Sequence, residues 1–230
     1  MLFKKKCVAV IVAAGESRRM GGCDKIFTDI LGVPLILRTL RAFEECGDIS
    51  KIIVVTRKDA VDTIKELCVK HSISKLDCVL EGGKTRAESV VNGLKKAQGK
   101  YHYVAVHDGA RPCITAGEIS AVYRTARKNI GAIPGVKVKD TIKVCKNGFV
   151  ETTPKRDELY AIQTPQIFRL DFLIASYINA KKKKLEVTDD AMAAEAFGIK
   201  VKLCEGSYKN VKVTTPEDLV AVKNYFEQVK

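Results

Sequence analysis

Short apolar runs rich in Val and Ile alternate along this chain with longer amphipathic stretches. Apolar runs bounded by turn signals are typical of buried strands, and apolar positions three and four apart are typical of helices that cover a sheet. The pattern predicts strands at 7–14, 51–56, 77–80, 103–107, 130–134 and 200–204. It predicts helices at 34–45, 58–71, 85–98, 115–129, 170–182, 188–197 and 216–228. This βαβ alternation indicates an α/β fold with a largely parallel sheet.

Three of the predicted helices begin with a capping signal. Thr85-x-x-Glu88, Thr115-x-x-Glu118 and Thr215-Pro216-x-Asp218 each place a hydroxyl and a carboxylate where free backbone N–H groups need acceptors. These signals support the predicted helix boundaries.

Residues 136–156 interrupt the α/β pattern. Apolar and polar residues alternate there on both sides of Asn147-Gly148, a strong signal for a two-residue β-hairpin turn. A two-stranded hairpin is marginally stable alone, so it needs a surface to pack on. The pattern leaves open whether that surface belongs to a second subunit or to the same domain.

Composition narrows the class of protein. The 230 residues predict one domain over 1–230, and the 46% hydrophobic fraction is enough for a core. No apolar run reaches the ~18 residues of a membrane-spanning helix. The net charge of +13 favours anionic partners, either nucleic acid, lipid head groups or small phosphorylated substrates. We interpret Lys181–Lys184 as a solvated helix end, where cations offset the helix dipole.

The cysteines predict the cellular compartment. Eight are scattered without a C-x-x-C pair, which is typical of a reduced, cytoplasmic protein and argues against zinc sites. Lys4–Lys6 and the apolar run after them mimic a signal peptide. A short strand that enters a glycine turn explains this run better.

The first candidate site is VAAGESRRMGGCDK at 12–25, directly after the first predicted strand. Small residues at 13–15 let backbone amides approach an anion, and Arg18, Arg19 and Lys25 carry charge for a triphosphate. The segment matches neither G-x-G-x-x-G nor the P-loop. A flexible basic loop is the alternative, although converging cations repel one another without an anion.

The second candidate is HDGARP at 107–112, at the end of a buried strand, where open α/β sheets bind ligands. Asp108 together with nucleotide phosphates suits Mg²⁺, which keeps several waters as ligands. The alternative is that Asp108 caps a turn or pairs with Arg111. We interpret His107 as structural, and we find no arrangement typical of nucleophilic catalysis.

Two further motifs are weaker. GGKTRAES at 82–89 gives backbone access at a helix start, which suits a base edge or an anion, although a plain strand-to-helix turn explains it equally well. NVKVT at 210–214 leads into the last helix, and Lys212 taken alone is best interpreted as a surface lysine.

Taken together in order, these motifs with Asp140-Thr141, Arg156, QTPQIF at 163–168 and TDDA at 188–191 resemble one family. The sequence resembles the 2-C-methyl-D-erythritol 4-phosphate cytidylyltransferases of the non-mevalonate isoprenoid pathway over about residues 7–228. HDGARP favours them over the sister ribitol-5-phosphate cytidylyltransferases, which remain the alternative. A basic nucleic-acid-binding module is a distant alternative, because stacking aromatics are few and Trp is absent.

The resemblance implies a nucleotidyltransferase on a Rossmann-like, mostly parallel sheet flanked by helices. It implies transfer of CMP from CTP to the sugar-alcohol phosphate with release of pyrophosphate, using Mg²⁺ or another divalent cation. It also implies a homodimer in which the hairpin of about 136–156 is a dimerisation arm, with no nucleic-acid or membrane partner.

The resemblance assigns roles to matching positions. It places Ala13, Ala14, Gly15, Gly83 and Ser89 around the nucleotide and Asp108 at the metal. It gives catalytic roles to Arg19, Lys25 and Lys212. It places Arg111, Asp140, Thr141, Arg156, Thr188 and Thr214 at the acceptor substrate, with Asp140, Thr141 and Arg156 reaching across a dimer.

This chain departs from the family pattern at three places. Asp24-Lys25-Ile26 replaces Pro-Lys-Gln, Lys84 stands where an acidic residue is common, and Lys155-Arg156-Asp157 replaces Asp-Arg-Asn. The charged centres are retained, and the resemblance does not carry over a side-chain contact to cytosine or ribose at position 84.

Overall fold

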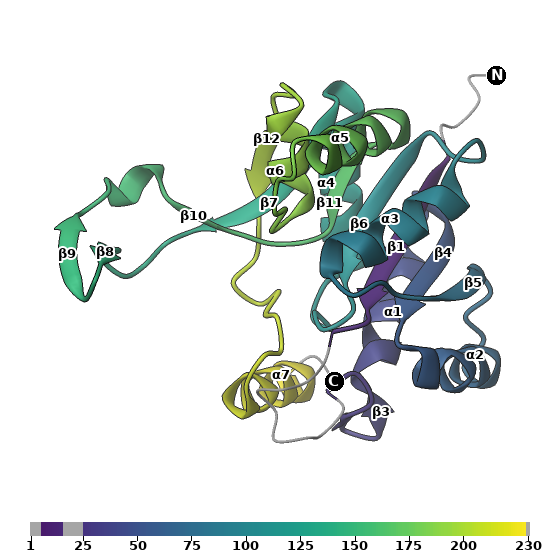
Figure 1. The fold of residues 1–230 in the computed structure, drawn as a ribbon. Helices are drawn as coiled ribbons and strands as arrows, with labels where there is room; N and C mark the ends of the chain where they lie inside the picture. The colour runs from purple at the N-terminus through teal and green to yellow at the C-terminus, as the bar shows by residue number, and fades with distance from the viewer. Residues whose placement is uncertain (1–5, 16–24, 229–230) are drawn as a thin grey trace.

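A mixed β-sheet lies between two layers of helices in the computed structural model, which describes residues 6–15 and 25–228 (Figure 1). The strand order is β10-β7-β11-β6-β1-β4-β5, and β12 also pairs with β7. The strands of this sheet are β1 (Cys7–Ala13), β4 (Ile49–Thr56), β5 (Leu76–Glu81), β6 (Tyr103–Asp108), β7 (Gly131–Lys137), β10 (Tyr160–Ile162), β11 (Gln166–Arg169) and β12 (Lys202–Glu205).

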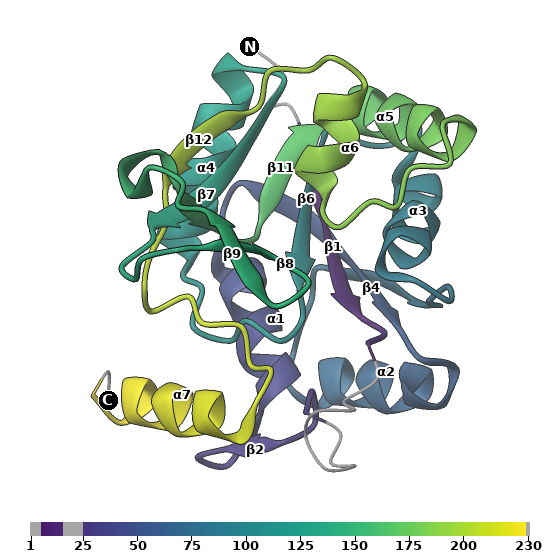
Figure 2. The same ribbon diagram turned by 60° about the vertical axis from the view of Figure 1, so that its left-hand side comes forward.

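Alternating side chains of the central strand β1 divide the core into two layers. Ala9 and Ile11 face the layer that contains α1 (Leu35–Glu45), α2 (Val61–Lys70) and α4 (Ala116–Lys128). Val8 and Val10 face the layer that contains α3 (Arg86–Ala97), α5 (Leu170–Lys182) and α6 (Asp190–Ala196) (Figure 2). Because a strand with both faces covered is apolar throughout, this arrangement explains the continuous Val and Ile runs.

The predicted elements are confirmed to within a few residues at their ends, with two differences. The predicted helix at 58–71 begins with a separate 3₁₀ turn, Lys58–Ala60, before α2. The pattern does not predict the strands β10 and β11, nor the two-residue strands β2 (Asp29–Ile30) and β3 (Val33–Pro34). β11 runs antiparallel between β6 and β7, and β10 runs antiparallel to β7, whereas the pairs β1–β4, β1–β6, β4–β5 and β7–β12 are parallel.

The predicted hairpin is present and projects from the sheet (Figure 1). β8 (Val144–Lys146) and β9 (Phe149–Thr152) are exposed along their whole length. Asn147 and Gly148 have φ of 50° and 84°, and a two-residue type I′ turn needs positive φ at both positions. We call residues 138–159, which lie between β7 and β10 and include the 3₁₀ turn Arg156–Glu158, the arm.

The last helix, α7 (Pro216–Gln228), lies apart from the two layers (Figure 2). Its buried Val222 joins a small cluster with Ile30 and Leu35, next to the short hairpin of β2 (Asp29–Ile30) and β3 (Val33–Pro34). None of the helices within 6–15 and 25–228 has the length and apolar character needed to cross a membrane.

Candidate functional site

The carboxyl ends of three parallel strands meet at one edge of the sheet. Val12 of β1 is in register with Asp108 of β6, and Ala13 is in register with Thr56 of β4. The turns that follow β6 and β5 stay attached to this edge, because Gly109 N donates to Val12 O and Gly82 N donates to Thr56 O, both at 2.8 Å. Beyond the edge lies a cleft of about 610 Å³.

Most of the predicted nucleotide and catalytic positions line this cleft. The predicted residues in its wall are Ala13, Ala14, Gly15, Lys25, Gly83, Ser89, Asp108 and Lys212. Arg19, with Arg18 and the glycines at 21 and 22, lies outside the described residues. The structure therefore brings motifs from both ends of the chain to one cavity.

Three cations hold the Asp108 carboxylate. Oδ2 lies 2.9 Å from Lys212 Nζ and 3.5 Å from Arg111 Nε, and Oδ1 lies 3.3 Å from Arg86 Nε. Burial alone would raise the pKa of Asp108, but Lys212, Arg86 and Arg111 outweigh it and hold the pKa well below its usual range. Asp108 is therefore ionised throughout the physiological pH range, and its pairing with Arg111 coexists with its place in the cleft.

Arg86 lines the cleft although no motif assigns it a role. Its second terminal nitrogen, Nη2, lies 3.0 Å from Oδ2 of Asp190, whose other oxygen accepts a hydrogen bond from the Tyr177 hydroxyl at 2.6 Å. Burial would lower the pKa of Arg86, but Asp190 and Asp108 raise it. The GGKTR and TDDA motifs contain both partners, yet nothing in the spacing pairs residues 104 positions apart.

His107 is structural, as the sequence indicates. Its Nδ1 lies 3.0 Å from Thr164 Oγ1 and its Nε2 lies 3.4 Å from Arg111 O, so a neutral ring satisfies both contacts. Burial lowers its pKa to about 3. Thr164 Oγ1 also accepts from Asp108 N at 3.1 Å, so this pair fixes the backbone that carries the carboxylate.

Asp108 can hold a hard cation only if a bound ligand supplies further oxygen atoms. The described residues contain no group of three or more His, Cys, Asp or Glu side chains that could hold a metal ion. A carboxylate has about four lone-pair sites, and three cations approach that of Asp108. Asp108 together with phosphate oxygens and waters fits Mg²⁺, which rarely needs a full protein cage.

The 82–89 segment forms one rim of the cleft. Thr85 caps α3 by accepting from Glu88 N, as predicted, while Glu88 Oε2 accepts from Lys84 N at 2.6 Å instead of from Thr85. Gly83 N donates to Ser89 Oγ at 3.1 Å. Lys84 is exposed and lines the cleft, so position 84 brings a lysine rather than an acidic residue to the rim.

Other predicted residues lie elsewhere. Asp140, Thr141 and Arg156 are exposed on the arm, which extends away from the cleft of its own chain (Figure 1). Thr188 is exposed, and its hydroxyl lies 3.4 Å from the Met192 sulfur. Thr214 Oγ1 donates to Asp218 Oδ2 at 2.8 Å at the start of α7. A single chain thus gathers the nucleotide positions but not the predicted acceptor-binding positions of the arm.

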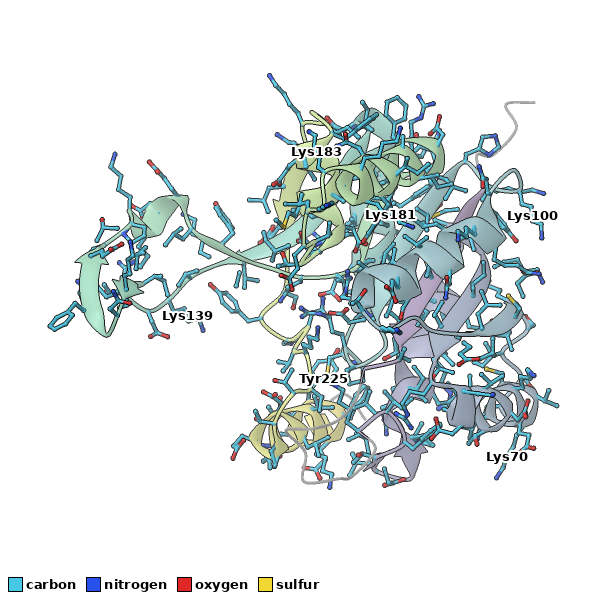
Figure 3. The ribbon with its side chains drawn as sticks, viewed as in Figure 1. Lys70, Lys100, Lys139, Lys181, Lys183 and Tyr225 are labelled. Atoms are coloured by element: carbon cyan, nitrogen blue, oxygen red, sulfur yellow. The ribbon has the colours of Figure 1, made fainter. Side chains whose placement is uncertain are left out.

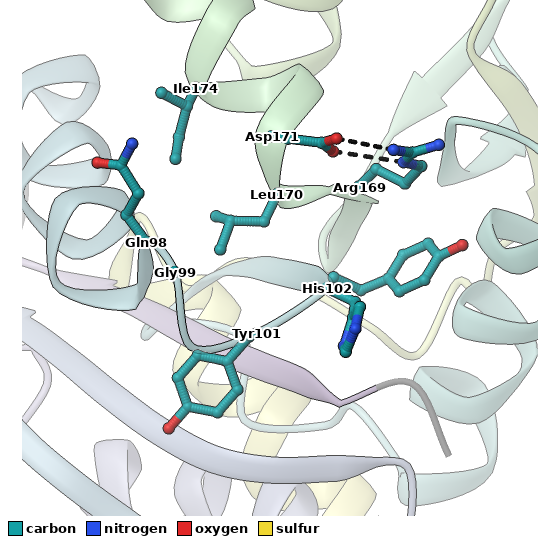
Figure 4. A pocket seen from close by; sticks show the side chains of 9 residues that line it. Gln98, Gly99, Tyr101, His102, Arg169, Leu170, Asp171 and Ile174 are labelled. Atoms are coloured by element: carbon teal, nitrogen blue, oxygen red, sulfur yellow. Dashed lines mark hydrogen bonds and ion pairs between the residues drawn. The ribbon is translucent and has the colours of Figure 1, made fainter. Parts of the chain in front are cut away.

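A second hollow of about 450 Å³ lies at the opposite end of β6 (Figure 4). Arg169 is its main cation, and it is paired with Asp171 at 2.7 Å. Since this guanidinium is already neutralised, the hollow lacks the converging charge of the cleft.

Surface lysines are distributed over separate elements. Lys70 ends α2, Lys100 follows α3, and Lys181 and Lys183 lie at the end of α5 (Figure 3). Much of the +13 charge therefore lies outside the cleft.

Comparisons with known proteins agree on one family. The model of the family described as 2-C-methyl-D-erythritol 4-phosphate cytidylyltransferase matches residues 7–228. A relative of that name from Clostridium perfringens is 44% identical over 96% of this chain and 98% of its own length. The crystal structure of 4-diphosphocytidyl-2C-methyl-D-erythritol synthase from Anaerococcus prevotii has a TM-score of 0.87 and 33% identity, covering 97% of each chain. The Thermus thermophilus 2-C-methyl-D-erythritol 4-phosphate cytidylyltransferase has a TM-score of 0.78 and 29% identity, covering 95% of this chain and 98% of that one.

Proposed function

This chain belongs to the 2-C-methyl-D-erythritol 4-phosphate cytidylyltransferase family, and from that premise we propose how its cleft performs the reaction. The chain transfers CMP from CTP to 2-C-methyl-D-erythritol 4-phosphate and releases pyrophosphate, in the non-mevalonate route to isoprenoids. The observation that supports the mechanism best is the convergence of Lys212, Arg86 and Arg111 on Asp108 at the strand-end cleft.

The reaction needs charge neutralisation more than proton transfer. The acceptor phosphate is largely ionised at pH 7 and attacks the α-phosphorus of CTP in line. One phosphate oxygen forms a bond to that phosphorus, and the bond to the pyrophosphate oxygen breaks. Because the attacking phosphate is already ionised, the reaction needs no general base, and the ring nitrogens of His107 are occupied by Thr164 and Arg111.

Lys25 and Lys212 are the groups that stabilise the reacting phosphate. Both line the cleft, and the Lys212 side chain is 40% exposed, so its ammonium can move from Asp108 to a phosphate oxygen when the nucleotide binds. Preorganised cations of this kind act most strongly where charge develops in the transition state. Arg19 is proposed for the same role from its motif.

Asp108 is the residue that would hold Mg²⁺, with phosphate oxygens and waters completing the ion's coordination. When bound, the ion would neutralise charge on the triphosphate. Arg86 and Arg111 keep the carboxylate ionised and oriented for that role.

The acceptor site needs a second subunit. The arm carries Asp140, Thr141 and Arg156 away from its own cleft, and its apolar Phe149 and Val150 are 78% and 61% exposed. A homodimer in which each arm reaches the other subunit would cover these apolar residues and bring Arg156 to the acceptor phosphate of the partner's cleft.

Steady-state release of pyrophosphate tests the catalytic assignment. We expect turnover with CTP and methylerythritol phosphate, far less with ribitol 5-phosphate or other nucleoside triphosphates, and none after divalent ions are chelated. Lys25→Ala and Lys212→Ala should each reduce kcat by roughly 10²–10³. Near-native turnover in both variants would contradict the assignment.

Hybrid dimers test the arm separately. Arg156→Ala disables the group sent to the partner, whereas Lys25→Ala disables the cleft of its own chain. Mixed subunits should regain activity, because one cleft in each hybrid has Lys25 and receives an intact arm. Absence of rescue despite measured subunit exchange would exclude the cross-subunit role of Arg156.

A further inference from the structure

The segment that carries Lys212 is attached to both ends of the arm. We call residues 206–213 the Lys212 segment, Gly135–Lys139 the outgoing root of the arm and residues 160–164 its returning root. The two roots pair with each other through β7 and β10, with Ile162 opposite Gly135 and Tyr160 opposite Lys137. The Lys212 segment follows β12, which pairs with β7, and so begins beside this junction.

Gln163 on the returning root binds the segment with both ends of its amide. Nε2 donates to Ser207 O at 2.8 Å, and Oε1 accepts from Ser207 N at 3.2 Å. The Gln163 side chain is buried and its own backbone N donates to Pro134 O at 2.8 Å. A buried amide with both groups satisfied holds its partner in a single position.

Gly206, at the start of the segment, packs closely against both Gln163 and the outgoing root. Gly206 N donates to Gly135 O at 2.9 Å. A Cβ at Gly206 would lie 2.6 Å from Gln163 Oε1 and 3.0 Å from the Gly135 backbone. The segment therefore lies directly against the outgoing root where Gln163 holds it.

Tyr208 makes the second attachment, on the outgoing root. Its hydroxyl donates to Lys137 O at 2.8 Å, and Lys139 Nζ lies 4.1 Å from the centre of its ring. Lys139 stands at the base of the arm (Figure 3). Through Gln163 and Tyr208, one short segment is bonded to the strand that enters the arm and to the strand that returns from it.

The same segment is anchored at the cleft. Asn210 Nδ2 donates to Thr164 O at 2.9 Å, and Asn210 O accepts from Arg111 at 2.8 Å. Val213 N donates to Ala110 O at 2.8 Å. These anchors flank Lys212, whose Nζ lies 2.9 Å from Asp108.

We propose that Gln163 is a positioning residue that sets Lys212 in the cleft, and that Gln163 and Tyr208 couple Lys212 to the arm. The proposal rests on the proposed catalytic role of Lys212 and on the arm as a subunit contact. A shift of either root moves the Lys212 segment, so docking of the arm on a second subunit influences the cleft of the subunit that sends it. The arm thus acts on its own active site as well as on its partner's.

The test is a double-mutant cycle in the full-length protein, measured as pyrophosphate release. Gln163→Met keeps the side-chain length and removes both hydrogen bonds to Ser207. We expect kcat to fall between roughly 10- and 100-fold, the cost of a misplaced catalytic group, while KM for CTP changes less than twofold. In the Lys212→Ala background the same change should cost less than twofold, because Gln163 acts through Lys212.

Tyr208→Phe provides a second variant that keeps the ring beneath Lys139 and removes only the bond to Lys137. We expect kcat to fall about fivefold, which corresponds to the loss of one neutral hydrogen bond. In the Lys212→Ala background the same change should again cause no further loss of kcat. If Gln163→Met does not fold, the double-mutant cycle of Tyr208→Phe with Lys212→Ala tests the proposal instead. Gln98→Met is the matched control, since Gln98 is exposed at the opposite end of the sheet, and it should leave kcat unchanged.

The outcomes separate this proposal from the proposed function. Losses that multiply in the double variants, or near-native kcat in the single variants, would overturn the positioning role while Lys212→Ala remains defective. If Lys212→Ala itself retains kcat, the catalytic assignment fails first and the positioning role fails with it.

Discussion

At the residue scale, the cleft depends on one carboxylate that is charged because of its neighbours. Asp108 is buried, and a buried carboxylate that loses its cations would be neutral or would destabilise the fold. Lys212, Arg86 and Arg111 offset that cost before any ligand binds. Of these three cations, Lys212 is the one proposed to move to a phosphate group, so the resting ion pair and the proposed transition-state contact share that side chain.

His107 leads to a prediction about acid stability. Its pKa is lowered to about 3 in the fold, against about 6.5 in the unfolded chain. The unfolded chain therefore binds the proton first as the pH falls, and the folded state loses stability between these two values. We expect the free energy of unfolding to fall by about 2 kcal/mol from pH 7 to pH 5 on account of His107 alone.

Urea unfolding at pH 7, 6 and 5 measures this effect. The variant His107→Asn can still accept from Thr164 but does not titrate in this range. Its free energy of unfolding should lose the part of the pH dependence due to His107. Equal pH dependence in the two proteins would show that His107 is not the group responsible.

At the element scale, the capping box of α4 shows how a local sequence signal stabilises a helix. Thr115 Oγ1 accepts from Glu118 N at 3.2 Å, and Glu118 Oε2 accepts from Thr115 N at 2.9 Å, which forms a complete capping box. Thr115→Ala should reduce the free energy of unfolding by about 1 kcal/mol. KM for CTP should not change, because α4 packs on the face of the sheet away from α3 and the cleft rim.

Thr125→Ala on the same helix is the control for the cap. Thr125 is half-buried and its hydroxyl donates to Ala121 O within the helix, so Ala, the better helix former, should cost less there than at the cap. Comparing the thermal unfolding of the two variants distinguishes the effect of losing the cap from the effect of replacing a threonine elsewhere on the same helix. Equal shifts in Tm would mean that the capping box contributes nothing measurable.

The elements that could be predicted are those with local signals. Asp108 follows a continuous apolar strand, and Asn147-Gly148 requires a tight turn, so both were expected where they are found. β11 was missed because it begins with a buried polar residue. The side-chain amide of Gln166 is hydrogen-bonded to Asp189 and to the Ala191 backbone, more than 20 positions away. No local sequence pattern predicts such partners. The role of Arg86 cannot be predicted for the same reason, because its partner Asp190 lies 104 positions away.

At the scale of the whole molecule, the arm predicts the state of assembly. Phe149 is 78% exposed in β9, which lies at the end of the arm far from the two helix layers (Figure 1). Phe149→Ser should therefore shift the protein from dimer toward monomer in sedimentation velocity and leave its unfolding temperature nearly unchanged. Val69→Ser is the matched control, because Val69 is 82% exposed on α2 and should not affect the mass. A dimer that persists unchanged in Phe149→Ser would argue against contact through the arm tip.

The antiparallel strand β11 has a consequence for how the chain reaches this fold. It fills the gap between β6 and β7, and its first residue pairs with Val106, although Val106 and Gln166 are separated by the whole of α4, β7 and the arm. During synthesis, β6 and β7 emerge with facing edges unpaired until residues 166–169 leave the ribosome. Unpaired edges are sites of aggregation, and pairing across such a separation is slow. The arm is thus synthesised before the sheet can close, and its length sets how long the nascent chain must keep two open edges apart.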